Sequence, residues 1–194
     1  MEFVINHQER YSRGELILRT LFGGIYISIP HYFLIFFVAV WGAVLEFITF
    51  WAILFTARFP ENIFSFQVRL LNWNLRVQAV TNNLIDGYPA FGLKGTSENA
   101  YLKIERPERV SRGLLLLRAL LGGFYVMIPH GICLYGLGIA SKFLVFLAFW
   151  AVLFKAEYPE KWHEFNIAVM RWGMRVTLYM GYFTDEYPPF SLQP

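Results

Sequence analysis

The sequence predicts an all-α integral membrane protein made of two tandem helical-hairpin modules, each followed by an amphipathic interfacial helix. Three observations support this fold class: an apolar composition, two long runs with almost no charge, and an internal repeat. Hydrophobic residues make up 56% of the 194 residues and charged residues only 16%. Because soluble domains carry roughly 25% charged residues, the composition favours a membrane protein.

Each apolar run is long enough to enter a bilayer. Glu46 is the only charged residue from Tyr32 to Phe55, and Lys142 is the only one from Gly131 to Phe154. Runs of about 18 or more apolar residues are typical of membrane helices. A lone cysteine excludes a disulfide framework within the chain. The net charge of +3 gives no indication of a nucleic-acid partner.

The chain contains two copies of one module. Shifting the sequence by 99 residues aligns 9–93 with 108–192 without a gap, and 34 of the 85 aligned positions are identical. We therefore predict a first module over 9–93, a polar linker over 94–107 and a second module over 108–192. Residues kept in both copies either build the module or perform its function. A residue found in one copy, such as Glu46 opposite Val145, is not essential to both.

The first helix of each module begins at a recognisable cap. Ser12 and Glu15 fit a capping box, in which each side chain bonds a free backbone N–H of the first turn. The second copy keeps the serine as Ser111. The helix is predicted to run from Gly14 to about residue 41, with a kink at Pro30, because proline removes one backbone hydrogen bond.

A turn is predicted next, which makes the module a hairpin. Gly42-Ala43 in the first copy and Ser141-Lys142 in the second have the residue types of a turn. A shorter apolar helix then returns to about Ala57 and Ala156. A third helix begins at Pro60 and Pro159, because proline favours the first position of a helix.

The third helix is amphipathic. A basic stripe opposite a Trp, Phe and Leu face is typical of a helix that lies in the membrane interface, and the alternative is a helix packed on a partner subunit. Near the start of each module, another arginine is expected to extend toward the headgroups. The predicted lipid-headgroup or partner contacts are therefore Arg19, Arg118, Arg69, Arg76, Arg171 and Arg175.

The charge distribution predicts the topology. If each module enters the membrane and returns, 16 of the 17 Lys and Arg residues lie on one side. A single crossing would instead place Lys142 near mid-bilayer, at a cost of about 2.5–3.5 kcal/mol. The hairpin therefore predicts that both termini are cytoplasmic. Because both hairpins have the same orientation, we expect a pseudo-two-fold axis along the membrane normal.

These features resemble a bacterial family of small membrane proteins catalogued as domain of unknown function 4389. The matching features are the Ile-Pro-His turn, the Trp-Ala-x-Leu-Phe stretch, the Tyr/Phe-Pro step, the basic amphipathic helix and the final Asp-x-Tyr-Pro-x-Phe, present in both copies. The first copy departs from the family's ending at Ala90 and Gly92. The resemblance implies a membrane hairpin, here in the bacterial inner membrane. Members have carried a lipase label, but the resemblance supplies no catalytic residues.

Two duplicated sets of polar residues have side chains that could perform chemistry. A hydrolase triad would need Ser12, His31 and Asp86, or their equivalents Ser111, His130 and Asp185. No Gly-x-Ser-x-Gly elbow is present, and each serine fits a helix cap. A haem between the two histidines is a further alternative. We expect instead that each imidazole satisfies carbonyls freed by the neighbouring proline, so no catalytic, metal or cofactor site is predicted.

The expected function is a non-enzymatic membrane module that assembles with, anchors or regulates a larger membrane complex, including one that handles lipids. Its partners would be membrane lipids and other membrane protein subunits. Two alternatives are a component of a lipid or ion transporter and a membrane-embedded lipid hydrolase. A transporter needs polar residues at mid-membrane, and apart from the histidines this chain has few.

Overall fold

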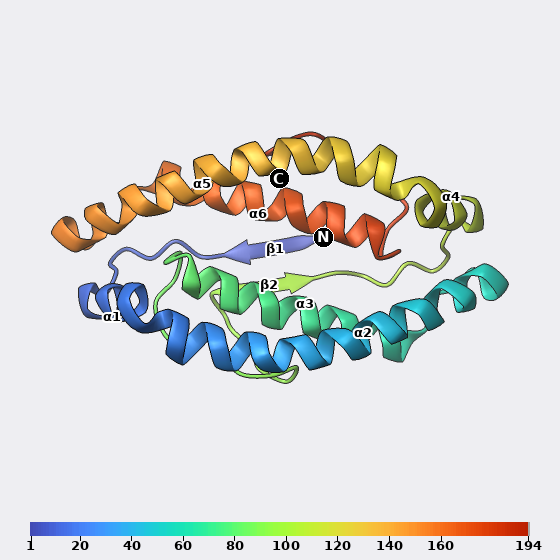
Figure 1. Ribbon diagram of the computed structural model, residues 1–194, viewed down its shortest axis with the longest axis horizontal. Coiled ribbons are helices and arrows are strands. Elements are labelled where there is room, and N and C mark those ends of the chain that lie inside the picture. Colours follow the sequence, from blue (N-terminus) through green and yellow to red (C-terminus); the bar gives the residue numbers. More distant parts are fainter. Residues whose placement is uncertain (194) are drawn as a thin grey trace.

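Two long apolar helices form the outer edges of the molecule (Figure 1). The computed structural model describes residues 1–193. In the first repeat, the long helix consists of α1 (Arg13–Gly23), a π-helical turn (Gly24–Ser28) and α2 (Ile29–Thr56). The second repeat matches it with α4 (Arg112–Gly122), a π-helical turn (Gly123–Met127) and α5 (Ile128–Lys155). By length and composition, both 44-residue helices could cross a membrane.

The predicted turns at Gly42-Ala43 and Ser141-Lys142 are wrong, because α2 and α5 continue through them. The chain reverses further on, after the left-handed residues Ala57 and Ala156. The helix that returns is α3 (Glu61–Thr81) in the first repeat and α6 (Glu160–Met180) in the second. Each repeat is therefore a hairpin of one long and one shorter helix. The break predicted at Pro30 takes the form of the π-helical turn that precedes it.

The residues that suggested a turn bind the neighbouring helix instead. The Gly42 carbonyl accepts a hydrogen bond of 2.7 Å from the Gln67 side chain on α3. At the matching place in the second repeat, the Ser141 hydroxyl donates to the Asn166 side chain on α6. Small and polar residues at this position thus fasten the long helix to the shorter one.

The short helices begin where predicted but lie in a different environment. Pro60 and Pro159 precede their first residues. The apolar side chains of α3 and α6 are buried inside the protein, including Trp73, Val77 and Trp172. These helices pack on α2, α5 and the strands, so the predicted interfacial position is wrong.

A two-stranded antiparallel sheet lies at the centre of the molecule (Figure 1). It pairs β1 (Glu2–Ile5) with β2 (Ala100–Lys103), which lies in the segment predicted as a linker. Its register places Phe3 opposite Leu102, and these two residues are separated by the repeat length of 99. Equivalent residues that face each other in an antiparallel pair lie on a two-fold axis. The pseudo-two-fold axis of the repeats therefore passes through this pair.

Each repeat also holds the end of the other repeat's long helix. The free carbonyls at the ends of α2 and α5 accept hydrogen bonds from backbone N–H groups and arginine side chains, as is common at helix C-termini. The matched bonds are Tyr11 to Ala156 and Val110 to Ala57, both 2.9 Å, and Arg13 to Phe154 at 2.8 Å and Arg112 to Phe55 at 2.7 Å. The duplicated Arg-x-Ser-Arg-Gly block thus joins the repeats.

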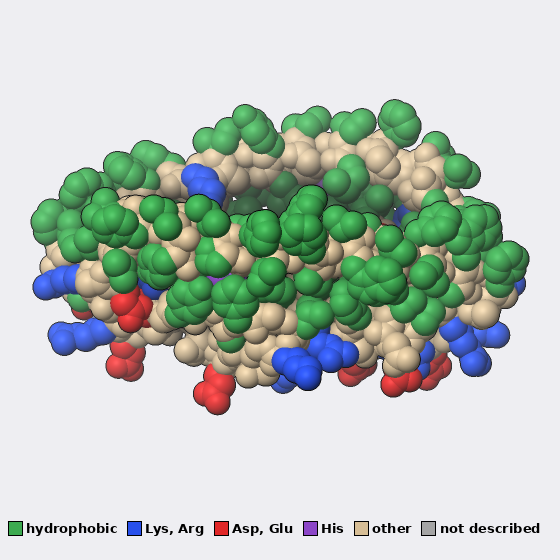
Figure 2. Space-filling model, turned by 60° about the horizontal axis from the view of Figure 1, so that its bottom comes forward, with side chains coloured by type: hydrophobic (Ala, Val, Ile, Leu, Met, Phe, Trp, Pro, Cys, Tyr) green, Lys and Arg blue, Asp and Glu red, His purple; other side chains and the backbone are tan. Residues whose placement is uncertain are grey.

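Both repeats contribute to one hydrophobic core, which includes Leu16, Ile27 and Trp73 from the first repeat and Val152 and Ile167 from the second. The outer surface is also apolar along the long helices, where many large side chains are exposed. Figure 2 shows these hydrophobic side chains over the upper part of the molecule, with a hollow between two ridges. Most of the charged side chains in that view lie along the lower rim.

Candidate functional site

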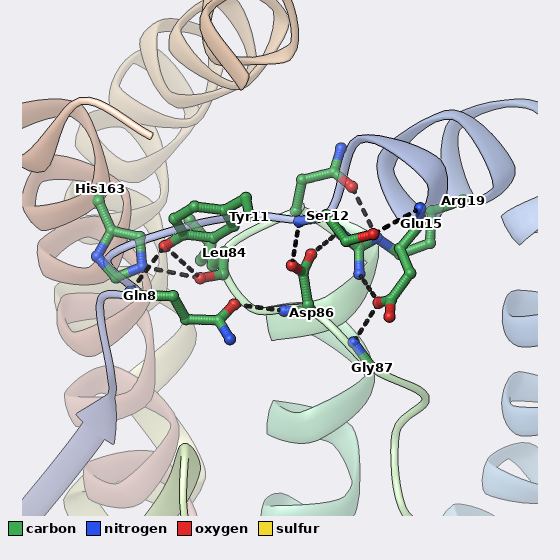
Figure 3. Close-up of polar contacts among 10 residues, drawn as sticks. Gln8, Tyr11, Ser12, Glu15, Arg19, Leu84, Asp86, Gly87 and His163 are labelled. Carbon is green, nitrogen blue, oxygen red and sulfur yellow. Dashed lines mark hydrogen bonds and ion pairs between the residues drawn. The ribbon is translucent and has the colours of Figure 1, made fainter. Parts of the chain in front are cut away.

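The duplicated polar residues gather where the segment after α3 meets the start of α1 (Figure 3). The Asp86 carboxylate accepts from the Ser12 backbone N–H at 2.6 Å and from the Arg19 guanidinium at 2.8 Å. The Ser12 hydroxyl accepts from the Glu15 N–H at 3.3 Å, which confirms the predicted helix cap. Glu15 accepts from the Gly87 N–H at 2.6 Å rather than completing a capping box. Asp86 takes that reciprocal role.

The second repeat has the same arrangement with a more deeply buried arginine. Asp185 accepts from the Ser111 N–H at 2.7 Å and from Arg118 at 2.5 Å. Arg118 also donates to the carbonyls of Tyr179 and Thr184. The Arg118 side chain has no exposed area and that of Arg19 is 3% exposed. The prediction that these two arginines extend to lipid headgroups is therefore wrong.

The arginines of the shorter helices hold the chain segments that follow those helices. Arg76 is buried and donates to the carbonyls of Ala90 at 3.3 Å and Gly92 at 2.9 Å. Arg175 donates in the same way to the carbonyls of Ser191 and Gln193. Both arginines thus bind the protein's own backbone. Burial contradicts the predicted headgroup or partner contact for Arg76, whereas for the half-buried Arg175 that contact stays a prediction. Of the predicted stripe, Arg69 is exposed and Arg171 half-buried, so these two also remain candidates for a lipid or partner contact.

Two tyrosines compensate for the helix prolines. Pro30 cannot donate to the carbonyl four residues earlier, that of Tyr26. The Tyr88 hydroxyl donates to this carbonyl at 3.1 Å. In the second repeat, Tyr187 donates to the Tyr125 carbonyl at 3.0 Å. The prediction that histidines satisfy these carbonyls is therefore wrong.

Each histidine is instead enclosed by aromatic side chains of its own repeat. His31 and His130 have no exposed area. Their Nδ1 atoms accept from the indole N–H groups of Trp73 and Trp172 at 2.9 Å. Their rings also pack against those of Phe91 and Phe190, with centroids 4.0 and 3.9 Å apart. Because α2 and α5 lie on opposite edges of the molecule (Figure 1), the two imidazoles do not meet at the axis, as the haem alternative required.

The Ser, His and Asp residues do not form a triad. Asp86 and its equivalent bind arginine and a backbone N–H, while each histidine binds a tryptophan. No group of three His, Cys, Asp or Glu side chains within residues 1–193 is placed to hold a metal ion. The duplicated motifs therefore form a structural clamp, in which the Asp-x-Tyr-Pro-x-Phe segment fastens α3 to α1 and α2.

Two contributions to this clamp were not predicted from the sequence. One signal could have indicated the role of Tyr88. A proline in a helix leaves one backbone carbonyl without its N–H donor, and Pro30 and Tyr88 are both duplicated at the same spacing. A second contribution joins the repeats. The His163 imidazole on α6 and the Tyr11 hydroxyl both bind the Leu84 carbonyl, at 2.9 and 3.2 Å (Figure 3). Phe64 stands at the position equivalent to His163 in the first repeat, so comparison of the copies could not reveal this contact.

His163 makes the stability of the fold depend on pH. Burial lowers the pKa of His163 from 6.5 to about 4. The unfolded chain therefore binds this proton more readily than the folded one, and stability falls as the pH drops below about 6.5. We expect a loss of about 2 kcal/mol from this group between pH 7 and pH 5. Thermal unfolding at the two pH values should show it.

The control for this prediction is His163→Gln, whose amide can still donate to the Leu84 carbonyl but does not titrate. The variant should lose markedly less stability than the wild type between pH 7 and pH 5. An unchanged pH dependence would show that other groups account for the acid sensitivity.

These observations define a class of protein: a duplicated helical protein whose repeated motifs clamp each hairpin together and whose long helices expose apolar side chains. Residues 116–191 match the family described as Domain of unknown function (DUF4389). The match covers most of the second repeat and does not extend over the first repeat. No curated protein and no solved structure matches the chain.

Proposed function

We propose that the protein is a non-enzymatic membrane module that lies in one leaflet and assembles with, anchors or regulates a larger membrane complex, including one that handles lipids. The observation that carries this proposal is the apolar outer surface of the two long helices. Leu21, Phe55 and Leu120 are 67%, 72% and 75% exposed. Soluble monomers rarely expose large contiguous apolar patches. Lipid is the environment in which such a surface is stable.

The distribution of charge favours helices that lie flat in the leaflet over helices that cross it. Figure 2 shows charged side chains along nearly the whole length of the lower rim. Arg69, Lys94 and Lys103 are exposed and belong to α3, the linker and β2, which lie beside the middle of α2 (Figure 1). A crossing along the long axis would place these charges within the bilayer, at a cost of a few kcal/mol each. An in-plane helix instead enters only ~5–10 Å into the headgroup region.

This orientation retains part of the predicted topology. The polar side is the surface opposite the exposed apolar side chains of the long helices, and it includes both termini and the linker. Its excess of Lys and Arg favours the cytoplasmic side of the bacterial inner membrane. The pseudo-two-fold axis is then parallel to the membrane normal. The long helices have no tip on the far side, because Ser141-Lys142 lies within α5. Among residues 1–193, the duplicated Ser, His and Asp side chains do not form a triad, so they give the hydrolase alternative no support.

Cysteine labelling in intact cells tests the orientation. In a background without Cys133, a cysteine replaces Glu98 on the polar side or one of the matched apolar residues Phe36 and Tyr135. A membrane-impermeant maleimide added outside should label none of the three variants. After the membrane is opened, only the Glu98→Cys variant should react, because the other two positions are shielded by lipid. Labelling from outside would contradict this orientation: at Glu98 it would place the polar side outside the cell, and at Phe36 or Tyr135 it would show that lipid does not shield the apolar face.

The assembly role is tested on the same cells. After mild solubilisation, the protein should migrate on native gels in a complex larger than a single chain. Photo-crosslinkers at Arg69 and Arg171 should give adducts with another membrane protein. A single chain that forms no adducts would contradict the proposed role in assembly.

A further inference from the structure

We propose that a pocket between the two repeats binds the primary ammonium group of a membrane amphiphile. The pocket has a volume of about 330 Å³ and is lined by residues of α2, α3 and α6 together with the second π-helical turn. Its lining combines Glu46, Gln67 and Thr177 with apolar side chains such as Met127 and Met180. Apolar walls with a few polar groups are typical of ligand sites of this size.

Glu46 is the feature of the pocket that the fold leaves unexplained. It is the only charged residue in the apolar run of α2, and its side chain is exposed. Among residues 1–193, no ion pair or side-chain hydrogen bond involves its carboxylate. An ionisable residue beside lipid is costly and points to a functional contact. A cation is the partner that a carboxylate in this position requires.

The other two polar groups of the pocket lining each offer an acceptor oxygen. The Gln67 amide nitrogen donates one N–H to the Gly42 carbonyl at 2.7 Å, and the amide oxygen is an acceptor. The Thr177 hydroxyl donates to the Gly173 carbonyl at 3.0 Å, so its oxygen can only accept. Together with Glu46, the pocket offers three acceptor groups. A primary ammonium has three N–H donors, whereas a quaternary ammonium has none.

The equivalent positions of the other repeat carry no such site. Val145 replaces Glu46, and Asn166 replaces Gln67. The Asn166 side chain is already bonded to Ser141, Tyr158 and its own helix. The polar groups on this side therefore satisfy one another. The duplicated motifs therefore build the fold. The two repeats differ at the pocket, where the first repeat has the Glu46 carboxylate and the second has Val145.

The ligand class follows from the pocket and from the proposed membrane position, on which this inference rests. The carboxylate requires a cation, the acceptors require N–H donors, and the apolar lining accommodates hydrocarbon. A phospholipid with an ethanolamine headgroup combines these properties. A lipid with a choline headgroup has the same charge but no N–H group. The pocket should therefore distinguish these two lipids.

Lipid selection by the full-length protein tests the inference. The protein is reconstituted into bilayers of equal amounts of phosphatidylethanolamine and phosphatidylcholine, extracted with mild detergent, and the retained lipids are quantified. We expect the wild type to enrich phosphatidylethanolamine about tenfold, since the carboxylate contact alone is of the size that gives such a ratio. Glu46→Gln and Glu46→Val should bring the ratio close to one. Glu61→Gln, at an exposed acid outside the pocket, is the matched control.

The lipid-selection experiment can fail independently of the labelling experiment that tests the membrane orientation. Equal retention of the two lipids by the wild type, or enrichment that persists in both Glu46 variants, would overturn the pocket assignment. Binding of dodecylamine over dodecanol in detergent micelles, lost in Glu46→Gln, would support the pocket even if the labelling experiment showed a different orientation. If dodecylamine does not bind while the labelling result stands, the pocket assignment fails and the membrane proposal remains.

Discussion

Replacing Asp185 by alanine should destabilise the protein by about 3–5 kcal/mol. The substitution leaves the Arg118 guanidinium buried with only carbonyl partners, and an uncompensated buried charge carries a cost of this size. It also removes the acceptor for the Ser111 N–H at the start of α4. Thermal or denaturant unfolding of the detergent-solubilised protein should show the loss. Glu186→Ala, at an exposed neighbouring acid, should change the stability by less than about 0.5 kcal/mol.

The matched substitution in the first repeat provides a second control. Asp86→Ala should cost less than Asp185→Ala, because Arg19 keeps a second carboxylate, that of Glu15, at 3.5 Å. In the second repeat, Leu114 stands at the position equivalent to Glu15. Arg118 therefore has no second carboxylate from this position. Equal losses in the two variants, or a loss below about 1 kcal/mol for Asp185→Ala, would contradict the role assigned to this ion pair.

Two lysines on the apolar face should weaken membrane binding about a thousandfold. Leu21 and Leu120 occupy equivalent positions, and both are highly exposed. Removing two leucines from lipid costs about 4 kcal/mol, which corresponds to roughly a thousandfold weaker partitioning. The Leu21→Lys, Leu120→Lys variant should therefore be released from neutral vesicles at a detergent concentration at which the wild type still floats with them.

The control for this prediction places two lysines on the surface outside the long helices. Glu9→Lys with Glu108→Lys changes another equivalent pair of exposed residues outside the long helices. This variant should float with neutral vesicles as the wild type does. If both double variants remain bound, the long helices are not the membrane-binding surface. If both are lost, the effect follows net charge rather than the apolar face.

Local sequence signals predicted where helices begin better than they predicted what the helices pack against. The Ser12 cap and the prolines before α3 and α6 act through backbone hydrogen bonds within a few residues, so they can be recognised without the fold. Gly42 has the residue type of a turn in the sequence, but the side chain that requires a glycine there lies on another helix. A Cβ at this position would lie 3.2 Å from the Leu70 side chain. Close packing, rather than a change of chain direction, requires the glycine.

The duplicated polar residues were misassigned for a related reason. Arg19 and Arg76 resemble surface cations in the sequence because their partners, Asp86 and the Ala90 carbonyl, lie 67 and 14 residues further along the chain. Comparison of the two copies identified these residues as important but could not separate construction of the module from its activity. The structure makes that separation, because each duplicated polar residue described above has a partner within the fold. Within residues 1–193, Glu46, which is present in one copy only, has no such partner.

The central strand pair bears on how chains with a single copy of the module would assemble. Phe3 and Leu102 are equivalent residues that face each other across the pair, so two separate single-module chains would bring identical edges together as an isologous homodimer. Fusion of the two copies turns this association into an intramolecular contact, which raises the effective concentration of one half for the other. It also frees the halves to diverge. In a homodimer every substitution appears on both sides of the axis, whereas the fused chain can keep a carboxylate at position 46 and a valine at 145.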